Sequence, residues 1–254
     1  MHDRGLMTQA NGHGQVGGRI VDIGHTHADV TGGWLRPAVF GAMDGLVSNF
    51  ALIAGVAGGV AGTGGDSGPV VLAGLAGLAA GAFSMAAGEY TSVASQAELA
   101  RAELAVERRE LVRSPLVEQD ELAERYVARG VEPDLARRVA QQLSRDPEHA
   151  LAAHAREELG VDPTDLPSPL VAAAASFLAF ALGAVLPVLP YLFGATSLLP
   201  ALVVAMIGLF SAGVLVARLT ARPWWWTGTR QLLLGGAAAA LTYGIGALVG
   251  TQLG

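Results

Sequence analysis

Five long runs of apolar residues constrain the fold of this chain more than any other feature of its sequence. The runs are approximately Pro37–Val60, Pro69–Glu89, Leu170–Leu192, Leu198–Leu219 and Gln231–Leu253. Each is close to the ~20 residues that an α-helix needs to cross the hydrocarbon core of a bilayer. Only 15% of the 254 residues are charged, whereas soluble domains typically carry about 25%. The sequence therefore predicts an all-α, polytopic membrane protein with five transmembrane helices.

The arginines lie on one side of this predicted membrane. The chain contains no lysine, and its 16 arginines fall before the first run, between the second and third, and from the end of the fourth run (Arg218) to the start of the fifth. By the positive-inside rule these segments are cytoplasmic and the C-terminus is outside. Exclusive use of arginine is typical of a GC-rich, bacterial genome. We therefore expect an integral protein of the bacterial inner (plasma) membrane, with its N-terminus in the cytoplasm.

The polar segments divide the chain into four parts. We expect a disordered cytoplasmic tail at 1–33, transmembrane helices one and two at 34–90, a cytoplasmic helical domain at 91–168, and transmembrane helices three to five at 169–254. In the tail, His25 and His27 are interpreted either as a weak metal site or as histidines of a floppy segment without fixed ligand geometry. The inserted domain holds most of the acids, 17 of 22 lying between Glu89 and Asp165. Such a block favours cations as partners and disfavours nucleic acid.

Proline, glycine and capping residues predict the helices of the inserted domain. The second transmembrane helix continues through Gln96–Val112, because this stretch lacks Gly and Pro, and it ends at Ser114 because Pro115 follows. Asp146 and Pro147 are the predicted N-cap and first residue of the last helix. The remaining predicted helices are Val117–Arg129, Asp134–Ser144 and 147–159, with Gly130 and Gly160 as stops.

Two acids lie inside the apolar runs, each near a methionine. Asp44 follows Met43 in the first run, and Glu89 lies four residues after Met85 in the second. Ionisable side chains at membrane depth are costly and are interpreted as functional by default. These four residues are therefore candidate ligands along a path for a cation that accepts both hard and soft ligands.

Simpler interpretations of the same residues stay open. Asp44 can be hydrogen-bonded within the helix bundle, with Ser48 or Asn49 as partner. Met85 on its own is more often a packing residue than a ligand. Glu89 lies near the cytoplasmic end of its run and can simply reach the interface.

The inserted domain carries acids at spacings that share a helix face. Glu103, Glu107 and Glu110 lie on one face of the extended second helix, Glu118 and Glu121 on the next helix, and His154, Glu157 and Glu158 near the end of the last. One interpretation is a solvated surface neutralised by interleaved arginines, namely Arg108, Arg109, Arg113 and Arg156. The other is a shared site for divalent iron, manganese or zinc, since oxygen and imidazole ligands suit these ions better than copper(I).

Several function classes are excluded by missing motifs. The chain has no cysteine, so thiolate metal sites and cysteine nucleophiles are absent. The sequence contains no phosphate-binding glycine loop, no nucleophilic triad and no paired Glu-x-x-His motif of a di-iron oxidase. We therefore expect neither an enzyme nor a permanently bound cofactor.

Three stretches resemble the vacuolar iron transporter family. They are FGAMDGLVS at 40–48, SMAAGEYTSV at 84–93 and SFLAFALGA at 176–184. Together with five spans and an acidic insert after the second, the resemblance covers about Trp34 to Leu253. It implies a homodimer of five membrane helices per chain, with the ion path at the dimer interface, that exchanges cytoplasmic iron(II), and often manganese, for protons.

The resemblance also assigns roles to individual residues. Asp44 matches the translocation acid and Met85 the pathway methionine. Glu107, Glu110, Glu118, Glu121 and Glu158 match the glutamates of the cytoplasmic metal-binding domain, whereas Glu103 matches none of them. The chain departs from the family at His154, which stands where a methionine ligand is expected.

The resulting hypothesis is a proton-coupled transporter that moves iron(II) out of the cytoplasm. Metal gathered by the glutamates and His154 passes to Glu89 and Met85 and then past Met43 and Asp44. Two alternatives remain: a manganese or zinc exporter of the same fold, since imidazole is a harder ligand than a thioether, and a membrane-tethered metal buffer or sensor without transport.

Overall fold

The computed structural model describes residues 15–16, 19–20, 33–61, 67–220 and 222–253. The chain divides into two units, Met1–Thr31 and Gly32–Gly254, each of which is described by itself. In the first unit, strands β1 (Gln15–Val16) and β2 (Arg19–Ile20) pair antiparallel. The rest of the predicted tail up to residue 32, including His25 and His27, lies outside the described residues.

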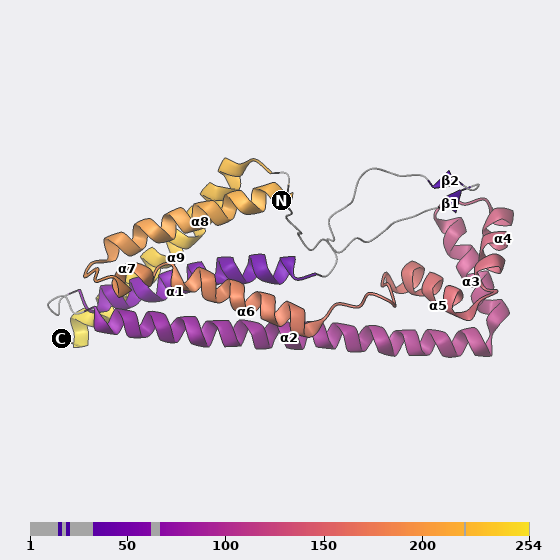
Figure 1. The fold of residues 1–254 in the computed structure, drawn as a ribbon, viewed down its shortest axis with the longest axis horizontal. Helices are drawn as coiled ribbons and strands as arrows, with labels where there is room; N and C mark the ends of the chain where they lie inside the picture. The colour runs from indigo at the N-terminus through magenta and orange to yellow at the C-terminus, as the bar shows by residue number, and fades with distance from the viewer. Residues whose placement is uncertain (1–14, 17–18, 21–32, 62–66, 221, 254) are drawn as a thin grey trace, which may run out of the picture. The chain divides into compact units, whose positions relative to one another are not determined.

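Helices account for almost all of the described part of the second unit (Figure 1). They are, in chain order, α1 (Leu35–Gly59), α2 (Gly68–Arg113), α3 (Pro115–Ala128), α4 (Pro133–Leu143), α5 (Pro147–His154), the π-helical turn η1 (Ala155–Leu159), α6 (Pro169–Val185), α7 (Leu189–Leu192), α8 (Leu198–Thr220) and α9 (Trp224–Leu253). Among the described residues, four helices are long and apolar enough to cross a membrane: α1, α2, α8 and α9. The predicted helical class is confirmed, and the predicted count of five spans is not.

The third predicted span differs from the structure. The sequence predicts one helix over Leu170–Leu192, but α6 ends at Val185 after 17 residues, and α7 is a separate helix of 4 residues beyond a turn. Pro187 and Pro190 account for the break, because proline lacks the backbone N–H of a helical hydrogen bond and its ring clashes with the preceding turn. The two prolines thus divide the predicted span into a long and a short helix.

The N-terminal end of the last span also differs from the prediction. The sequence predicts that this helix begins at Gln231, whereas α9 begins at Trp224. Trp224, Trp225 and Trp226, which lie between the fourth and fifth apolar runs, therefore form the first turn of the helix.

Helix α2 runs without interruption for 46 residues, as the absence of Gly and Pro after residue 89 predicts. Its C-terminal part extends past α1 and α6 to α3, α4 and α5 (Figure 1). It ends where Ser114, with φ −137° and ψ 53°, leaves the helical region before Pro115. One rigid helix therefore connects the apolar bundle to the acidic helices.

The predicted caps of the acidic helices are confirmed. The Asp146 carboxylate accepts hydrogen bonds from the backbone N–H groups of Glu148 and His149, both at 2.9 Å, and begins α5. Gly130 and Gly160 have φ of 93° and 66°, which is the left-handed conformation that ends a helix. These caps fix the ends of the helices that carry the acids.

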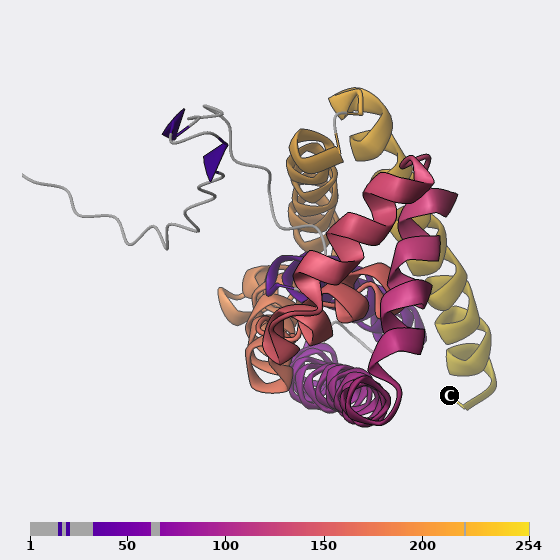
Figure 2. The same ribbon diagram turned by 90° about the vertical axis from the view of Figure 1, so that its right-hand side faces the viewer.

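Helix α1 is the centre of the bundle. Figure 2, which looks along α2, shows α1 with α2 and α6 on one side and α8 and α9 on the other. Glycines allow backbone to approach backbone here: a Cβ on Gly45 or Gly183 would overlap a carbonyl oxygen across the α1–α6 contact. A Cβ on Gly246 of α9 would overlap the carbonyl oxygen of Gly55 in α1.

Gly246→Ala tests the contact between α1 and α9. The added methyl group would force the two helices apart, so we expect a loss of about 1–3 kcal/mol of stability. Gly244→Ala is the matched control in the same helix, because a Cβ there meets no atom of the described residues within 4 Å. Thermal unfolding of the purified protein in detergent measures the difference, and equal midpoints for the two variants would contradict this packing.

Candidate functional site

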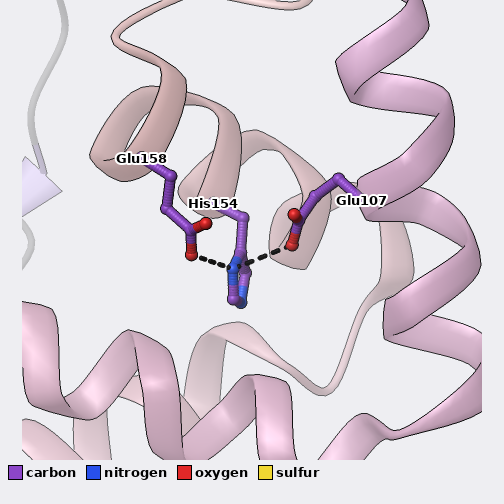
Figure 3. A group of neighbouring side chains, drawn as sticks. All are labelled: Glu107, His154 and Glu158. Atoms are coloured by element: carbon purple, nitrogen blue, oxygen red, sulfur yellow. Dashed lines mark hydrogen bonds and ion pairs between the residues drawn. The ribbon is translucent and has the colours of Figure 1, made fainter.

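A cluster of two carboxylates and an imidazole lies where three helical segments meet. Glu107 comes from α2, His154 is the last residue of α5, and Glu158 belongs to η1; both carboxylates point toward the imidazole (Figure 3). Nδ1 of His154 is 2.8 Å from Oε1 of Glu158 and 3.0 Å from Oε1 of Glu107. One candidate ligand atom from each residue lies within 4.8 Å of the others. The structure thus brings together three of the six residues that the sequence predicts as metal ligands.

His154 is the most buried member of the cluster, with 0% of its surface exposed. A carboxylate only accepts hydrogen bonds, so Nδ1–H donates to Glu158 and the contact with Glu107 is electrostatic. Nε2 of His154 is buried and has no hydrogen-bond partner among the described residues. The π-helical turn η1 directs Glu158 back onto the imidazole, and such turns are frequent at functional sites.

Burial raises the pKa of two carboxyl groups in this region. The pKa of Glu107 rises above its ordinary value of 4.5 mainly because the group is buried; His154 opposes the shift, and the carboxylates of Glu158, Glu118 and Glu121 add to it. Burial also raises the pKa of Glu118, which His154 opposes and neighbouring carboxylates reinforce. The ionised acids are therefore less favourable in the folded protein than in an unfolded chain, and a bound cation would relieve the repulsion.

The other three predicted ligands surround this trio. Oε2 of Glu118, on α3, lies 3.9 Å from Nδ1 of His154. Oε1 of Glu121 lies 3.1 Å from the guanidinium of Arg125. Oε1 of Glu110 lies 3.9 Å from the guanidinium of Arg113. Glu118 is thus close enough to join the trio after a small side-chain movement, whereas Glu110 and Glu121 are held by arginines.

Arg125 belongs to this region and is not identified by the sequence analysis. Its Nη2 lies 3.1 Å from Oε1 of Glu121 and 3.3 Å from Oε2 of Glu158. The i,i+4 spacing of Glu121 and Arg125 is a signal for their pairing. The contact with Glu158 joins segments that are distant in sequence and has no such signal. Arg125 thus supplies positive charge beside the trio.

The arginines that the sequence suggests as neutralising partners mostly bind elsewhere. Arg113 lies near Glu110, but Arg108 pairs with Glu148 and Arg156 with Asp162 at 2.7 Å. A solvated, arginine-neutralised surface therefore describes the rim of the acidic helices. Within the trio, Glu158 contacts Arg125, whereas Glu107 and His154 have no ion pair with an arginine among the described residues. This trio offers two carboxylate oxygens and one imidazole nitrogen, which suit a divalent cation of intermediate hardness.

A groove of about 460 Å³ between α1, α2 and α6 contains three of the four predicted pathway residues. Asp44 lines it from α1, Met85 and Glu89 from α2, and the ring of Phe180 from α6. The two carboxylates and the thioether therefore face one cavity. Nothing in the sequence predicts that Phe180 lines this groove.

The two residues of the Met43–Asp44 pair face different neighbours. Asp44 Oδ1 accepts a hydrogen bond of 2.7 Å from Ser48 Oγ within the groove, whereas Asn49 Nδ2 bonds to the carbonyl oxygen of Ala184. The thioether of Met43 lies 3.3 Å from the amide nitrogen of Gln231 on α9, and Met43 is not among the described residues that line the groove. Successive residues on a helix point in different directions, which explains why adjacency in sequence does not place both side chains in one site.

Comparison with known proteins gives a consistent result. The sequence pattern of the family described as the VIT family matches residues 35–247. The chain is 38% identical over 227 residues to a vacuolar iron transporter of Acanthamoeba castellanii, covering 86% of this chain and 79% of that protein. It is 31% identical over 234 residues to vacuolar iron transporter 1 of Oryza sativa subsp. japonica, covering 90% and 91%. It is 35% identical over 223 residues to vacuolar iron transporter homolog 1 of Arabidopsis thaliana, covering 86% and 84%.

Glu118→Gln tests whether the acidic cluster is a cation site. The pKa of Glu118 is higher in the folded protein than in the unfolded chain, so its ionised carboxylate destabilises the fold. This destabilisation is complete above the folded-state pKa and disappears below the unfolded-state pKa. The uncharged, isosteric glutamine should therefore leave the metal-free thermal midpoint at pH 7 unchanged or higher. It should also reduce the rise in midpoint that Mn²⁺ or Fe²⁺ causes, because ligand-induced stabilisation scales with affinity.

Glu124→Gln is the control for this substitution, since Glu124 is an exposed acid of the same helix. Thermal unfolding with and without metal measures all three proteins. If the metal-induced shift of Glu118→Gln equals that of the parent, the acidic cluster does not bind the ion through Glu118.

Proposed function

Because the chain belongs to the VIT family, we propose that it moves iron(II) out of the cytoplasm across a membrane in exchange for protons. The observation that carries this proposal is that one continuous helix, α2, contributes to both candidate sites: Glu107 to the acidic cluster, and Met85 and Glu89 to the groove. Relatives named vacuolar iron transporters support iron as the cargo.

The acidic cluster is the proposed capture site. Glu107, His154 and Glu158 supply the first ligands, and Glu118 joins them once a cation draws its carboxylate inward. Glu110 and Glu121 lower the local electrostatic potential and are the remaining ligands that we propose. Because burial and repulsion disfavour the ionised acids, a cation of charge +2 gains from neutralising them, and deprotonated ligands are the form that binds metal.

The groove is the proposed membrane part of the path. Along α2, Glu89 and Glu107 are 18 residues apart, which corresponds to about 27 Å. An ion released from the cluster would therefore meet Glu89 first, then the thioether of Met85, then Asp44. Cations and protons compete for the same carboxylate oxygens, so Asp44 can exchange one for the other. Met43 faces α9, and its proposed role is limited to packing beside Asp44.

The dimer and the orientation in the membrane are further parts of the proposal. Phe40 and Leu52 line the groove and are 61% and 40% exposed, so a second copy of the chain would cover apolar surface and close the groove. The arginine distribution supports acidic helices on the cytoplasmic side, as an inserted domain at 91–168 requires. In a bacterium, this orientation corresponds to export across the inner membrane.

Two other functions are compatible with the acidic cluster. An exporter of manganese or zinc would use the same ligands, and His154 favours it because imidazole accepts both ions. A membrane-tethered buffer or sensor would use the acidic cluster alone and would not require Asp44, Met85 and Glu89 in the groove. The groove residues favour transport over the buffer.

Asp44→Asn tests the membrane path. Asparagine keeps the shape of the side chain and can still accept the hydrogen bond from Ser48, but it can neither carry a proton nor balance the charge of the ion. We expect iron(II) flux into proteoliposomes under a proton gradient to fall roughly tenfold or more. Asp120→Asn, at an exposed acid of α3, is the control. Parent-like flux in Asp44→Asn would refute the assignment of Asp44.

His154→Met tests the metal preference of the capture site. A thioether is a softer ligand than an imidazole, so the harder ion Mn²⁺ should compete less effectively with iron(II) in the variant than in the parent, whereas Zn²⁺, which accepts both nitrogen and sulfur ligands, should compete about as well. The measurement is inhibition of iron(II) flux by each ion. Unchanged inhibition by Mn²⁺ would mean that His154 does not contact the transported metal.

A further inference from the structure

Asn49 is a buried polar residue in the middle of the apolar helix α1. Its side chain is 2% exposed, and it lines the same groove as Asp44. Nδ2 donates a hydrogen bond of 2.6 Å to the carbonyl oxygen of Ala184 on α6. Its other polar atom, Oδ1, is buried and has no hydrogen-bond partner among the described residues. A buried amide oxygen without a partner is unfavourable, so this atom needs an explanation.

The contact with Ala184 fixes the orientation of the amide. A carbonyl oxygen only accepts, so the atom that faces Ala184 must be the nitrogen, and Oδ1 must point the other way. On that side lies Gly77 of α2, another residue of the groove wall; a Cβ on Gly77 would lie 2.7 Å from Oδ1. The side chain of Leu52 shares this space, since its Cδ2 would overlap the same Cβ, so a side chain at position 77 would crowd both Leu52 and the amide oxygen.

Three oxygen-bearing side chains of α1 follow one another along the groove. Asp44 comes first, Ser48 is one turn on and bonded to it, and Asn49 is about 7.5 Å beyond Asp44 along the helix axis. Ser48 Oγ uses its hydrogen in the bond to Asp44 Oδ1, which leaves its lone pairs available. The side chains near Glu89 include a thioether, whereas the ligands at this end are all oxygen.

We propose that Asn49 Oδ1, with Ser48 Oγ beside it, is a second binding position for a divalent cation, one step beyond the Asp44 carboxylate and deeper in the groove than Met85 and Glu89. The inference rests on the proposed transport function, because the cation is the cargo. Carboxylate, hydroxyl and amide oxygens are ligands of hard divalent cations such as Mn²⁺ and Fe²⁺. The ion thus moves from a site that includes sulfur to one of oxygen only.

The neutral amide has a specific role in this site. It coordinates the cation without taking up or releasing a proton, so proton exchange stays on Asp44 while Asn49 holds the ion one turn further on. Asn49 also selects for hard ions, because its oxygen gains little from a soft cation.

Asn49→Ala and Gly77→Ala are two independent tests. Asn49→Ala removes the ligand together with the bond to Ala184, whereas Gly77→Ala keeps Asn49 and crowds its oxygen together with the side chain of Leu52. Thr242→Val is the matched control: Thr242 of α9 donates a bond of 2.6 Å to the carbonyl oxygen of Ala51 on α1, and it lies outside the described lining of the groove. The assay is Mn²⁺ and Fe²⁺ flux into proteoliposomes, normalised to folded protein by size-exclusion chromatography and thermal unfolding.

We expect both groove variants to lose about tenfold in flux at low metal concentration, while Thr242→Val loses stability without loss of normalised flux. If Asn49→Ala behaves like Thr242→Val and Gly77→Ala transports like the parent, Asn49 only ties α1 to α6 and the second site is refuted. Absence of Mn²⁺ and Fe²⁺ flux in the parent refutes the proposed transport function instead. The two failures are therefore distinguishable.

Discussion

The contact between α1 and α6 is the constraint on which the groove depends. Gly45 and Gly183 let each helix approach the main chain of the other, and neither position has room for a Cβ. Since Gly45 faces α6, its neighbour Asp44 is turned toward the groove and Met43 toward Gln231 of α9. The close packing of Gly45 against α6 thus fixes the direction in which the Asp44 side chain points.

The second constraint is the unbroken length of α2. A helix of 46 residues holds its two ends at a fixed distance, so Glu107 and Glu89 cannot approach one another. The acidic cluster is completed by α3, α5 and η1, whereas the groove is completed by α1 and α6. The two candidate sites therefore share no ligand, and helix α2 fixes the distance between them.

Much of the fold was predictable because its signals are local. Apolar length, the Ser114–Pro115 break, the Asp146 cap and the Gly130 and Gly160 stops each act within a few residues, and the structure agrees with them. The division of the third span was missed because the effect of a proline depends on the hydrogen bonds that neighbouring turns can still make.

The candidate sites were predictable only in part, because their geometry is not local. Helix-face spacing predicts Glu107, His154 and Glu158 as candidate ligands of a shared metal site, and the structure places them together. Which other residues join them depends on contacts between distant segments, such as that of Arg125 with Glu158. The environment of Asn49 Oδ1, which has no hydrogen-bond partner among the described residues, likewise depends on Ala184 and Gly77, which belong to two other helices.

The central claim is that a single kind of ion occupies both the acidic cluster and the groove. Anomalous X-ray scattering from crystals grown with Mn²⁺, recorded on both sides of the manganese absorption edge, locates the ion directly. The account predicts one peak between Glu107, His154 and Glu158 and another in the groove beside Asp44. Peaks confined to exposed carboxylates, with none at either place, would contradict it.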